Sequence, residues 1–350
     1  MKASYKKYIL DFKRPSGTSR GVLTQKETWF IILEENGNYG IGECGLLQGL
    51  SIDDVMGYEE KLKWTCENIE KGRDTLLNSL ERFPSIQFGL EQAFLSLASK
   101  NSFELFDTGF VRSGIPIPIN GLIWMGDEVF MHSQIDQKIV QGFRCIKMKI
   151  GAIDFESELQ ILESIRNKYS KEEIELRVDA NGAFMPEKAV EKIRRLATFD
   201  LHSIEQPIKQ GNWEALKMLC ASTPLPIALD EELIGIFGVT NKEKLLQTIR
   251  PQYIILKPSL IGGYEGSEEW IALAEKYRIG WWVTSALESN IGLSAIAQWT
   301  ATLKNKMPQG LGTGSLYTNN FESPLEVENG SLYYRKNKDW STNLIKELCT

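Results

Sequence analysis

Two short stretches, CIKMKI at residues 145–150 and ELRVDAN at residues 175–181, decide how this chain is expected to fold. Each begins like a strand that is buried on both faces, and such strands are normally apolar throughout. Here each strand also carries charge towards its C-terminal end. Because successive side chains of a strand alternate between its faces, Lys147 and Lys149 lie on one side of their strand, as Arg177 and Asp179 do on theirs. The pattern predicts charged groups that point into the fold.

The same arrangement recurs along the chain at a regular interval. Asp179, Glu205, Asp230 and Lys257 each end an apolar run, and they follow one another at intervals of 26, 25 and 27 residues. One strand, one helix and two loops fill each interval. This alternation predicts parallel strands joined by crossover helices. The charges then lie at the C-terminal ends of the strands, where the active sites of β/α barrels are found.

Counting strands in this way favours a closed barrel over an open sheet. The predicted strands are Ile115–Ile119, Cys145–Ile150, Glu175–Asp179, Ser203–Glu205, Pro226–Asp230, Tyr253–Lys257, Trp281–Ser285 and a segment near Leu311. No Gly-x-Gly-x-x-Gly or P-loop sequence follows the first strand, which disfavours nucleotide binding.

The N-terminal part has a different, antiparallel pattern. We expect strands at Tyr5–Leu10, Thr28–Glu35 and Tyr39–Glu43, with a tight turn between the last two. Pro15–Gly21 is expected to be a flexible loop, and helices are predicted over about 58–71 and 85–100.

Composition excludes several classes of protein. Hydrophobic residues make up 42% of the 350 residues and the formal net charge is -6, without a basic stripe, so we expect no nucleic acid partner. No apolar stretch is long enough to cross a bilayer and no secretory signal is visible, so we expect no membrane partner. The five scattered cysteines indicate reduced thiols in the cytoplasm. Only two histidines are present, so acid–base chemistry must rely mostly on other residues.

The three carboxylates point to a metal ion. A single carboxylate at a strand end is commonly a helix cap or a surface ion pair. Asp179, Glu205 and Asp230 instead occupy three consecutive strands, between strands that carry lysine. Inward charges are costly unless they are paired or bind a metal. Together they predict a hard oxygen site for Mg²⁺, where Mn²⁺ could substitute.

In their order and spacing, Lys-x-Lys, Asp-Ala-Asn, Glu-Gln-Pro, Asp-Glu, Lys-Pro and Glu-Ser resemble the muconate-lactonising subgroup of the enolase superfamily. The resemblance covers nearly the whole chain. It implies an α/β fold, a modified TIM-type β/α barrel with an N-terminal α+β capping domain. The implied division is residues 1–112 for the capping domain, 113–317 for the barrel, and 318–350 for a C-terminal segment that returns to the capping domain.

The resemblance also implies roles for the charged residues. Asp179, Glu205 and Asp230 would bind one Mg²⁺. Lys149 would be the acid–base lysine, Lys257 the lysine that faces it from the opposite strand, and Lys147 an accessory lysine. The mandelate-racemase branch uses a His–Asp pair late in the barrel, and no histidine of this chain lies there.

Within the subgroup, TSALESNIG at residues 284–292 and GLGTG at residues 310–314 resemble the o-succinylbenzoate synthases. Those enzymes dehydrate 2-succinyl-6-hydroxy-2,4-cyclohexadiene-1-carboxylate on the route to menaquinone, which implies a small-molecule carboxylate substrate. Two alternatives stay open: an epimerase or racemase of dipeptides or N-acylamino acids on the same scaffold, and a non-catalytic protein that binds metal or carboxylate. The sequence does not indicate an oligomeric state.

Further residues are candidates for contacts with the substrate. Arg177 could reach the succinyl carboxylate, or could instead form an ion pair inside the barrel. Asn181 and Glu231 lie next to predicted metal ligands and could tune the metal and the lysines. Arg20 lies in a loop, Gly17–Gly21, that could close over the site. The remaining candidates are Ser285, Gly312 and Thr313.

Overall fold

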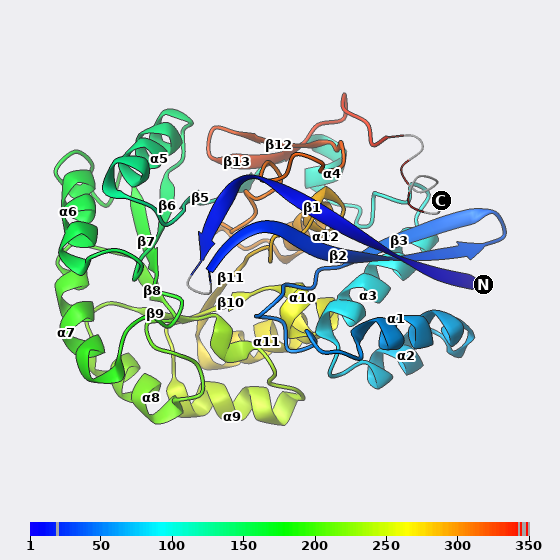
Figure 1. Cartoon of the computed structure of the whole chain (residues 1–350), viewed down its shortest axis with the longest axis horizontal. Helices are drawn as coiled ribbons and strands as arrows, with labels where there is room; N and C mark the ends of the chain where they lie inside the picture. Colours follow the sequence, from blue (N-terminus) through cyan, green and yellow to red (C-terminus); the bar gives the residue numbers. More distant parts are fainter. Residues whose placement is uncertain (19–20, 342–343, 345–347, 349–350) are drawn as a thin grey trace.

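The chain forms an antiparallel N-terminal sheet, a curved parallel sheet ringed by helices and a small C-terminal sheet (Figure 1). The computed structural model describes residues 1–18, 21–341, 344 and 348. The helices follow the outer side of the parallel sheet, and the N-terminal hairpin extends across the open end of its strands. The predicted class, a β/α barrel with a separate antiparallel N-terminal unit, is confirmed.

The N-terminal sheet has the order β1 (Lys2–Thr18), β2 (Gly21–Glu35) and β3 (Asn38–Cys44). The predicted turn between β2 and β3 is present. Asn36 and Gly37 both have positive φ, at 51° and 80°, as a two-residue hairpin turn with the twist of its strands requires.

The first hairpin differs from the prediction. Pro15–Thr18 and Gly21 belong to the strands instead of forming a loop, so the expected loop was wrong for these residues, and Ser19 and Arg20 lie outside the described residues. The pairing shifts register between Asp11 and Ser16 and then resumes with Ser16 opposite Leu23. Proline is tolerated there because β1 is an edge strand and its irregular segment has no ladder to maintain.

Helices pack against this sheet and lead to the barrel. They are α1 (Tyr58–Glu67), η1 (Ile69–Lys71), α2 (Arg73–Ser79), α3 (Pro84–Ala98) and α4 (Gly109–Ser113). Helix α3 lies very close to β3, because a Cβ on Gly42 would come within 1.8 Å of the carbonyl oxygen of Gly89. Glycine at this crossing permits the close approach of the two backbones.

The parallel sheet has the order β11-β10-β9-β8-β7-β6-β5. Its strands are β5 (Gly121–Ile123), β6 (Cys145–Lys149), β7 (Glu175–Asp179), β8 (Ser203–Glu205), β9 (Ile227–Leu229), β10 (Tyr253–Leu256) and β11 (Gly280–Val283). The intervening helices are α5 (Glu128–Val140), α6 (Phe155–Arg166), α7 (Pro186–Ala197), α8 (Trp213–Ser222), η2 (Glu231–Leu233), α9 (Val239–Ile249), α10 (Pro258–Ile261), α11 (Gly263–Tyr277) and α12 (Asn290–Leu303). Asp127, Asp154 and Asn212 begin α5, α6 and α8 by accepting backbone N–H groups with their side chains.

The barrel closes differently from the prediction at its two ends. The first predicted strand, Ile115–Ile119, was wrong: β4 (Ile117–Pro118) pairs with β13, and the barrel begins at β5. Near Leu311 the chain makes isolated bridges from Gly310 to Thr284 and from Gln309 to Ile119, which join β11 to the segment before β5. These bridges replace a regular eighth strand.

The C-terminal segment lies against both of the other sheets. Strands β12 (Leu325–Glu328) and β13 (Ser331–Tyr334) form a hairpin that pairs with β4. The backbone N–H of Thr318 donates to the carbonyl of Asp11 on β1 at 2.9 Å. Trp340 belongs to the same buried hydrophobic cluster as Phe30 of the N-terminal sheet. The boundaries at residues 112 and 317 stay a prediction.

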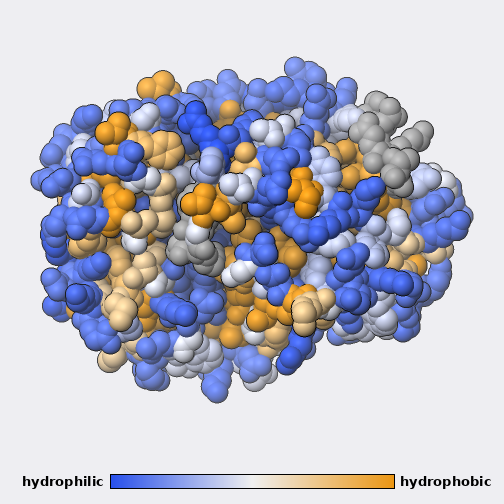
Figure 2. Space-filling view, in the orientation of Figure 1, coloured by the Kyte–Doolittle hydropathy of each residue, from blue (hydrophilic) through white to orange (hydrophobic). Residues whose placement is uncertain are grey.

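The surface is mixed in character. Figure 2 shows hydrophobic residues interrupting a mostly hydrophilic face near its middle, beside the end of the β1–β2 hairpin, where Val22 is 66% exposed. Within the described residues, no helix combines the length and the apolar character needed to cross a membrane.

Candidate active site

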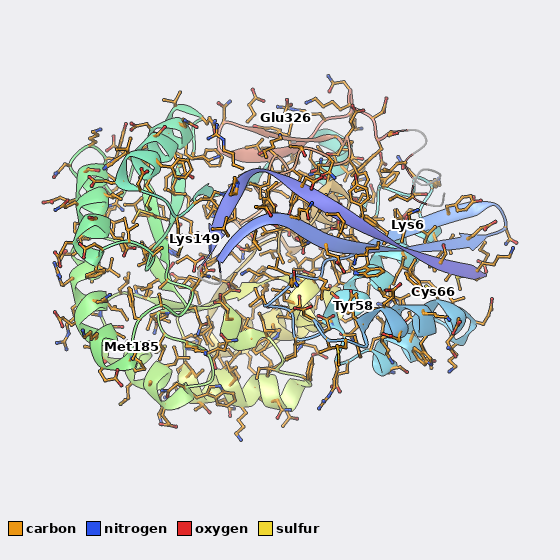
Figure 3. The ribbon with its side chains drawn as sticks, viewed as in Figure 1. Lys6, Tyr58, Cys66, Lys149, Met185 and Glu326 are labelled. Atoms are coloured by element: carbon orange, nitrogen blue, oxygen red, sulfur yellow. The ribbon has the colours of Figure 1, made fainter. Side chains whose placement is uncertain are left out.

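The predicted charged residues meet at the C-terminal end of the parallel strands. Lys147 and Lys149 lie on β6, Asp179 and Glu205 end β7 and β8, and Asp230 and Lys257 directly follow β9 and β10. Strands β6 and β10 are four positions apart in the order of the barrel, so Lys149 and Lys257 reach its interior from opposite sides. Lys149, labelled in Figure 3, lines the same cavity as Val22 of β2.

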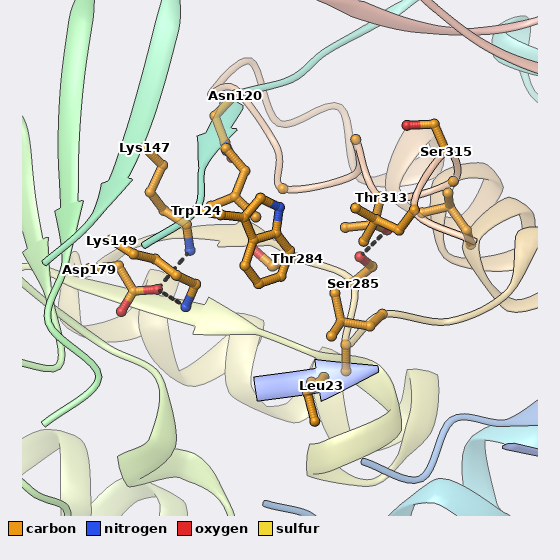
Figure 4. Close-up of a pocket in the computed structure, with 18 of the residues that line it drawn as sticks. Leu23, Asn120, Trp124, Lys147, Lys149, Asp179, Thr284, Ser285, Thr313 and Ser315 are labelled. Carbon is orange, nitrogen blue, oxygen red and sulfur yellow. Dashed lines mark hydrogen bonds and ion pairs between the residues drawn. The ribbon is translucent and has the colours of Figure 1, made fainter. Parts of the chain in front are cut away.

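Short contacts connect these groups. The Nζ of Lys147 lies 2.8 Å from Glu205 Oε2 and 3.3 Å from Asp179 Oδ2. The Nζ of Lys149 lies 3.1 Å from Asp179 Oδ2 (Figure 4) and 2.7 Å from the side-chain oxygen of Asn181. On the other side, Lys257 is paired with Asp230. The structure therefore brings together all six residues of the predicted lysine and carboxylate set.

Burial and neighbouring charges shift the pKa values of two carboxyls in this cluster. Asp179, Glu205 and Asp230 are each at most 2% exposed. Burial opposes ionisation of Asp179, but Lys149 and Lys147 outweigh it and hold the pKa of this carboxyl below its usual range. Burial and the neighbouring Asp179 raise the pKa of Glu205 well above its usual value. The pKa values of these two adjacent carboxyls thus shift in opposite directions, as happens where like charges share a site.

The donor set suits a hard divalent cation. Carboxylate oxygens are the ligands that Mg²⁺ and Mn²⁺ prefer. Glu205 Oε1 is buried and has no hydrogen-bond partner among the described residues, so one oxygen of the cluster is left for a cation. In the described part of the chain, no three acidic, histidine or cysteine side chains already enclose a space for an ion. The lysine ammonium groups hold the carboxylate oxygens, and a cation would compete with them.

The residues beside the carboxylates hold the cluster in place. The backbone N–H of Asn181 donates to Asp179 Oδ1 at 3.1 Å, and its side-chain amide donates to Glu231 Oε1 at 3.0 Å. Gln206 accepts hydrogen bonds from the backbone N–H groups of Asp230 and Glu232, both at 3.2 Å. These contacts link the ends of three neighbouring strands and fix the orientation of their carboxylates.

Unusual backbone conformations gather at the same end of the barrel. Asn181, Gln206 and Leu287 have positive φ, at 42°, 37° and 62°. Residues other than glycine rarely adopt such values, and they persist where the surrounding structure enforces them, often at functional sites. Gln206 directly follows β8, Asn181 lies in the turn just after β7, and Leu287 lies in the loop after β11.

A cavity of about 960 Å³ opens above the lysines. Lys147, Lys149, Lys257 and Asp179 line its base. Leu23 and Val22 of the hairpin line it from the N-terminal side, and the loop after β11 lines it from the barrel. A small molecule that reaches the lysines is therefore enclosed by both parts of the chain.

Trp124 is the largest side chain that sequence reasoning missed in this cavity. Its backbone N–H donates to Gln134 Oε1 and its carbonyl accepts from Gln134 Nε2, both at 3.0 Å. In Figure 4, its indole ring lies between the two lysines of β6 and the Ser285–Thr313 pair. Its position two residues after Leu122, at the end of the first barrel strand, is a signal only once that strand has been assigned correctly.

The predicted substrate-contact residues have mixed placements. Asn181, Ser285, Gly312 and Thr313 line the cavity, and the hydroxyls of Ser285 and Thr313 share a hydrogen bond of 2.7 Å (Figure 4). Arg20 and most of the tip of the Gly17–Gly21 segment lie outside the described residues, so their placement stays a prediction.

Arg177 lies elsewhere. Its Nε donates to Glu175 at 2.7 Å, its Nη1 donates to the Pro308 carbonyl at 3.0 Å, and its guanidinium lies 4.3 Å from the centre of the Trp282 ring. It is 1% exposed and is not among the residues that line the cavity. The geometry supports the alternative that the sequence left open for it, an ion pair inside the barrel.

Comparisons with known proteins place the chain among enzymes of one kind. A family model described as enolase C-terminal domain-like matches residues 131–338. The chain is 49% identical to the o-succinylbenzoate synthase of Desulfotalea psychrophila, over 95% of this chain and 98% of that protein. The crystal structure of MenC from Desulfotalea psychrophila LSv54 superposes with a TM-score of 0.85 at 44% identity, over 95% of this chain and 99% of that one.

Epimerases are more distant relatives. The L-Ala-D/L-Glu epimerase of Bacillus subtilis is 28% identical over 58% of this chain and 54% of that protein. A dipeptide epimerase from Enterococcus faecalis V583, complexed with Mg and the dipeptide L-Leu-L-Tyr, has a TM-score of 0.83 at 19% identity, over 95% of this chain and 96% of that one. At that identity the likeness concerns the fold alone.

Proposed function

The chain belongs to the enolase superfamily, and we propose that it works there as an o-succinylbenzoate synthase. In this reaction, 2-succinyl-6-hydroxy-2,4-cyclohexadiene-1-carboxylate loses water and becomes 2-succinylbenzoate, a step on the route to menaquinone. The observation that carries the proposal is the 49% identity to a synthase over nearly the full length of both chains. The epimerases, which share the scaffold, match at much lower identity.

The two lysines suit an elimination at a ring carbon. Lys149 and Lys257 line the cavity from opposite sides of the barrel. We assign to Lys149 the removal of the proton next to the substrate carboxylate. The protonated Nζ then returns a proton to the departing hydroxyl on the same face, so that water leaves and the ring becomes aromatic. Aromatisation supplies the driving force, and general acid–base catalysis of this kind is worth about 10²–10⁴-fold for each proton transfer.

Lys257 has a different role in this assignment. It remains charged on the opposite face of the ring, where its positive charge stabilises the negative charge that builds up on the substrate. Asp230 keeps it charged: burial lowers the pKa of Lys257, but the adjacent carboxylate outweighs burial and raises it. A fixed cation above a ring is also attracted to the ring face.

Asp179, Glu205 and Asp230 would hold the divalent cation, with Mg²⁺ as the proposed ion and Mn²⁺ as a substitute. When bound, such a cation neutralises the negative charge that develops at the substrate carboxylate. Lys147 is then an accessory lysine. Its contacts with Glu205 and Asp179 hold two of these carboxylates in position when the cation is absent.

The rest of the cavity would bind the remainder of the substrate. Ser285, Gly312, Thr313 and Asn181 are the proposed contacts that the structure describes in the cavity lining. Arg20 remains a proposed contact. We also propose that the protein works in the cytoplasm, because the four cysteines within the described residues are unpaired.

An activity assay tests the proposal directly. Purified protein with Mg²⁺ should convert the cyclohexadiene carboxylate to 2-succinylbenzoate, and the formation of an aromatic product can be followed by ultraviolet absorbance. L-Ala-L-Glu and an N-succinylamino acid serve as competing substrates in the same buffer. Epimerisation or racemisation that outpaces dehydration would overturn the assignment in favour of the epimerase alternative. Metal binding without turnover of any substrate would favour the non-catalytic one.

A further inference from the structure

A group of buried ionisable residues lies where the N-terminal sheet meets the barrel. It contains one lysine and two glutamates: Lys26 on β2, Glu43 on β3 and Glu288 in the loop after β11. Lys26 is 3% exposed, and both glutamates are 0% exposed. None of the three lines the cavity, so any effect on the reaction must pass through other residues.

Glu43 connects the N-terminal sheet to the start of α12. Its carboxylate accepts the backbone N–H groups of Ser289 and Gly292, both at 2.9 Å, and the hydroxyl of Ser289 at 2.5 Å. A negative charge at the N-terminus of a helix is favourable. A Cβ on Gly292 would come within 2.8 Å of Glu43 Oε2, so glycine there permits the carboxylate to enter.

Glu288 connects two loops that border the cavity. It accepts the Ser259 hydroxyl at 2.6 Å and the backbone N–H of Ala286 at 2.7 Å. Ser259 comes two residues after Lys257, and Ala286 lines the cavity itself. The position of Glu288 therefore controls how the Lys257 segment and the loop after β11 sit relative to each other.

Lys26 is the cation of this group, but it forms no ion pair with Glu43 or Glu288 among the contacts of the described residues. Its ammonium has no hydrogen-bond partner among the described residues. Burial lowers the pKa of Lys26, and attraction to Glu43 and Glu288 acts against burial. Leu23, three residues before Lys26 on the same strand, lines the cavity. Lys26 thus lies where β2, which we call the covering strand, meets the barrel.

Stability alone does not explain such a cluster. Buried ionic groups carry a large desolvation cost, and apolar residues of similar size often stabilise a protein as well or better. A second joint in the same protein shows a simpler solution. Glu91 of α3 accepts the backbone N–H groups of Tyr264 and Glu265 at the start of α11, and it touches no cavity loop. In the part of the chain that the structure describes, no buried lysine contacts this carboxylate, and the cation that faces it, Arg73 at 3.8 Å, is 37% exposed.

We propose that Lys26, Glu43 and Glu288 form a positioning cluster that sets the distance between the covering strand and the loop after β11, and thereby sets how tightly substrate binds. The proposal rests on the proposed synthase function. Glu43 ties the N-terminal sheet to α12 and Glu288 ties the loop after β11 to Ser259, both by hydrogen bonds. Lys26 attracts the two carboxylates from β2 without a direct contact, and the substrate is enclosed between Leu23 and Ala286. Proton transfer at Lys149 does not depend on this distance once substrate is bound.

The test compares this joint with the matched joint at Glu91. Lys26→Met and Glu43→Gln should each raise KM at least tenfold and change kcat less than threefold. Glu91→Gln removes a carboxylate that is buried and caps a barrel helix in the same way, so it should lower the melting temperature without moving KM. Equal KM changes in all three variants, or unchanged KM in Lys26→Met and Glu43→Gln, would overturn the proposal.

Hydrogen exchange separates this proposal from the proposed function. If the wild-type protein does not dehydrate the cyclohexadiene carboxylate, the synthase assignment fails on its own. The cluster can still be tested there, because Lys26→Met should speed exchange of the backbone amides of residues 21–26 and 284–288. Glu91→Gln should leave both segments unchanged. Unchanged exchange in Lys26→Met would overturn the positioning role whatever the reaction.

Discussion

The two ends of the barrel interior both bury charge, but they treat it differently. At the mouth, three lysines face three carboxylates, Asp179 is shared between Lys147 and Lys149, and one oxygen of Glu205 has no partner among the described residues. At the opposite end, which we call the floor, Arg177 is held by Glu175, the Pro308 carbonyl and the face of Trp282. Arg177 Nη2 makes no hydrogen bond among the described residues but lies 2.7 Å from Glu175 Oε1. The floor is closed, whereas the mouth is open to a cavity.

This difference distinguishes a charged residue that stabilises the fold from one that takes part in the proposed reaction. Arg177 and Asp179 lie on the same face of β7 but two residues apart, a step of about 6.6 Å along the strand. That step is enough to move a side chain from the cavity base to the closed floor. The charged groups at the mouth, which could exchange their partners for a cation or a substrate, lie beside the cavity. The charged groups at the floor keep partners within the protein. Variants at the two ends should therefore fail in different ways.

The largest expected effect is at the mouth. Lys149→Ala should lower kcat by about 10⁴-fold or more, because one side chain carries both proton transfers and each is worth about 10²–10⁴-fold. The fold should survive, since the change removes a buried charge from a crowded cluster. Steady-state kinetics of the folded variant provide the measurement. A Lys149→Ala enzyme within tenfold of wild type would show that another group is the base.

The next effect is at the floor, and it concerns stability. Arg177→Met leaves Glu175 and the Pro308 carbonyl without their donor. Removing one member of a buried ion pair costs about 3–5 kcal/mol, and Glu175 is partly exposed, so we expect about 3 kcal/mol lost from the unfolding free energy. Urea denaturation measures this loss. A large fall in kcat with unchanged stability would instead place Arg177 in the catalytic machinery.

A smaller effect distinguishes charge from proton transfer at Lys257. If Lys257 serves as a fixed cation, Lys257→Arg should keep at least about tenfold more dehydration activity than Lys257→Ala, although arginine also alters size and geometry. Initial rates of both variants with the cyclohexadiene carboxylate provide the comparison. An alanine variant as active as wild type would remove Lys257 from the account.

The smallest expected effect is a pH dependence at the floor. Burial lowers the pKa of His202 and outweighs the attraction of Glu175, so the folded protein binds fewer protons than the unfolded chain as the pH falls below 6.5. The stability that His202 contributes is therefore present above this pH and is lost on acidification.

Melting temperatures between pH 5 and 8 test this sign. His202→Phe keeps a ring against Tyr253, which lies 4.8 Å away, but cannot titrate, so its melting temperature should fall less on acidification. His132→Gln, on the outer helix α5, is the matched control and should follow wild type. If the melting temperature of His202→Phe falls on acidification as much as that of wild type, the stabilising role of neutral His202 at the floor would be contradicted.

Much of the barrel could be predicted from the sequence because its pattern repeats. The interval from Asp179 to Lys257 fixed the order of strands, and alternation placed Lys147 and Lys149 on the inner face. Alternation shows which face of a strand a side chain occupies, but not how far along the barrel axis it lies. For this reason the sequence could not assign Arg177 to the mouth or to the floor. The alternating Ile-Pro-Ile-Pro-Ile of residues 115–119 also looks like a barrel strand, but it lies beside β13.

The joint between the two parts could not be predicted at all. Glu43 and Ser289 are separated by 246 residues, and neither stretch carries a motif that pairs them. Lys26 lies in the polar run Thr24–Thr28, on a strand whose predicted bounds began later, at Thr28. Such contacts depend on how the N-terminal sheet packs on the barrel, and local sequence patterns do not predict that packing.

Titration of metal-free protein with Mg²⁺ tests the central claim most directly, because the mouth is interpreted as a cation site and the floor is not. Calorimetry and dehydration rates are followed together in wild type, in Glu205→Gln and in the floor variant Arg177→Met. We predict one ion per wild-type chain and no turnover before it binds. Glu205→Gln should bind at least about tenfold more weakly, and Arg177→Met should bind as wild type does. Full turnover by the metal-free protein, or unchanged affinity in Glu205→Gln, would contradict the account.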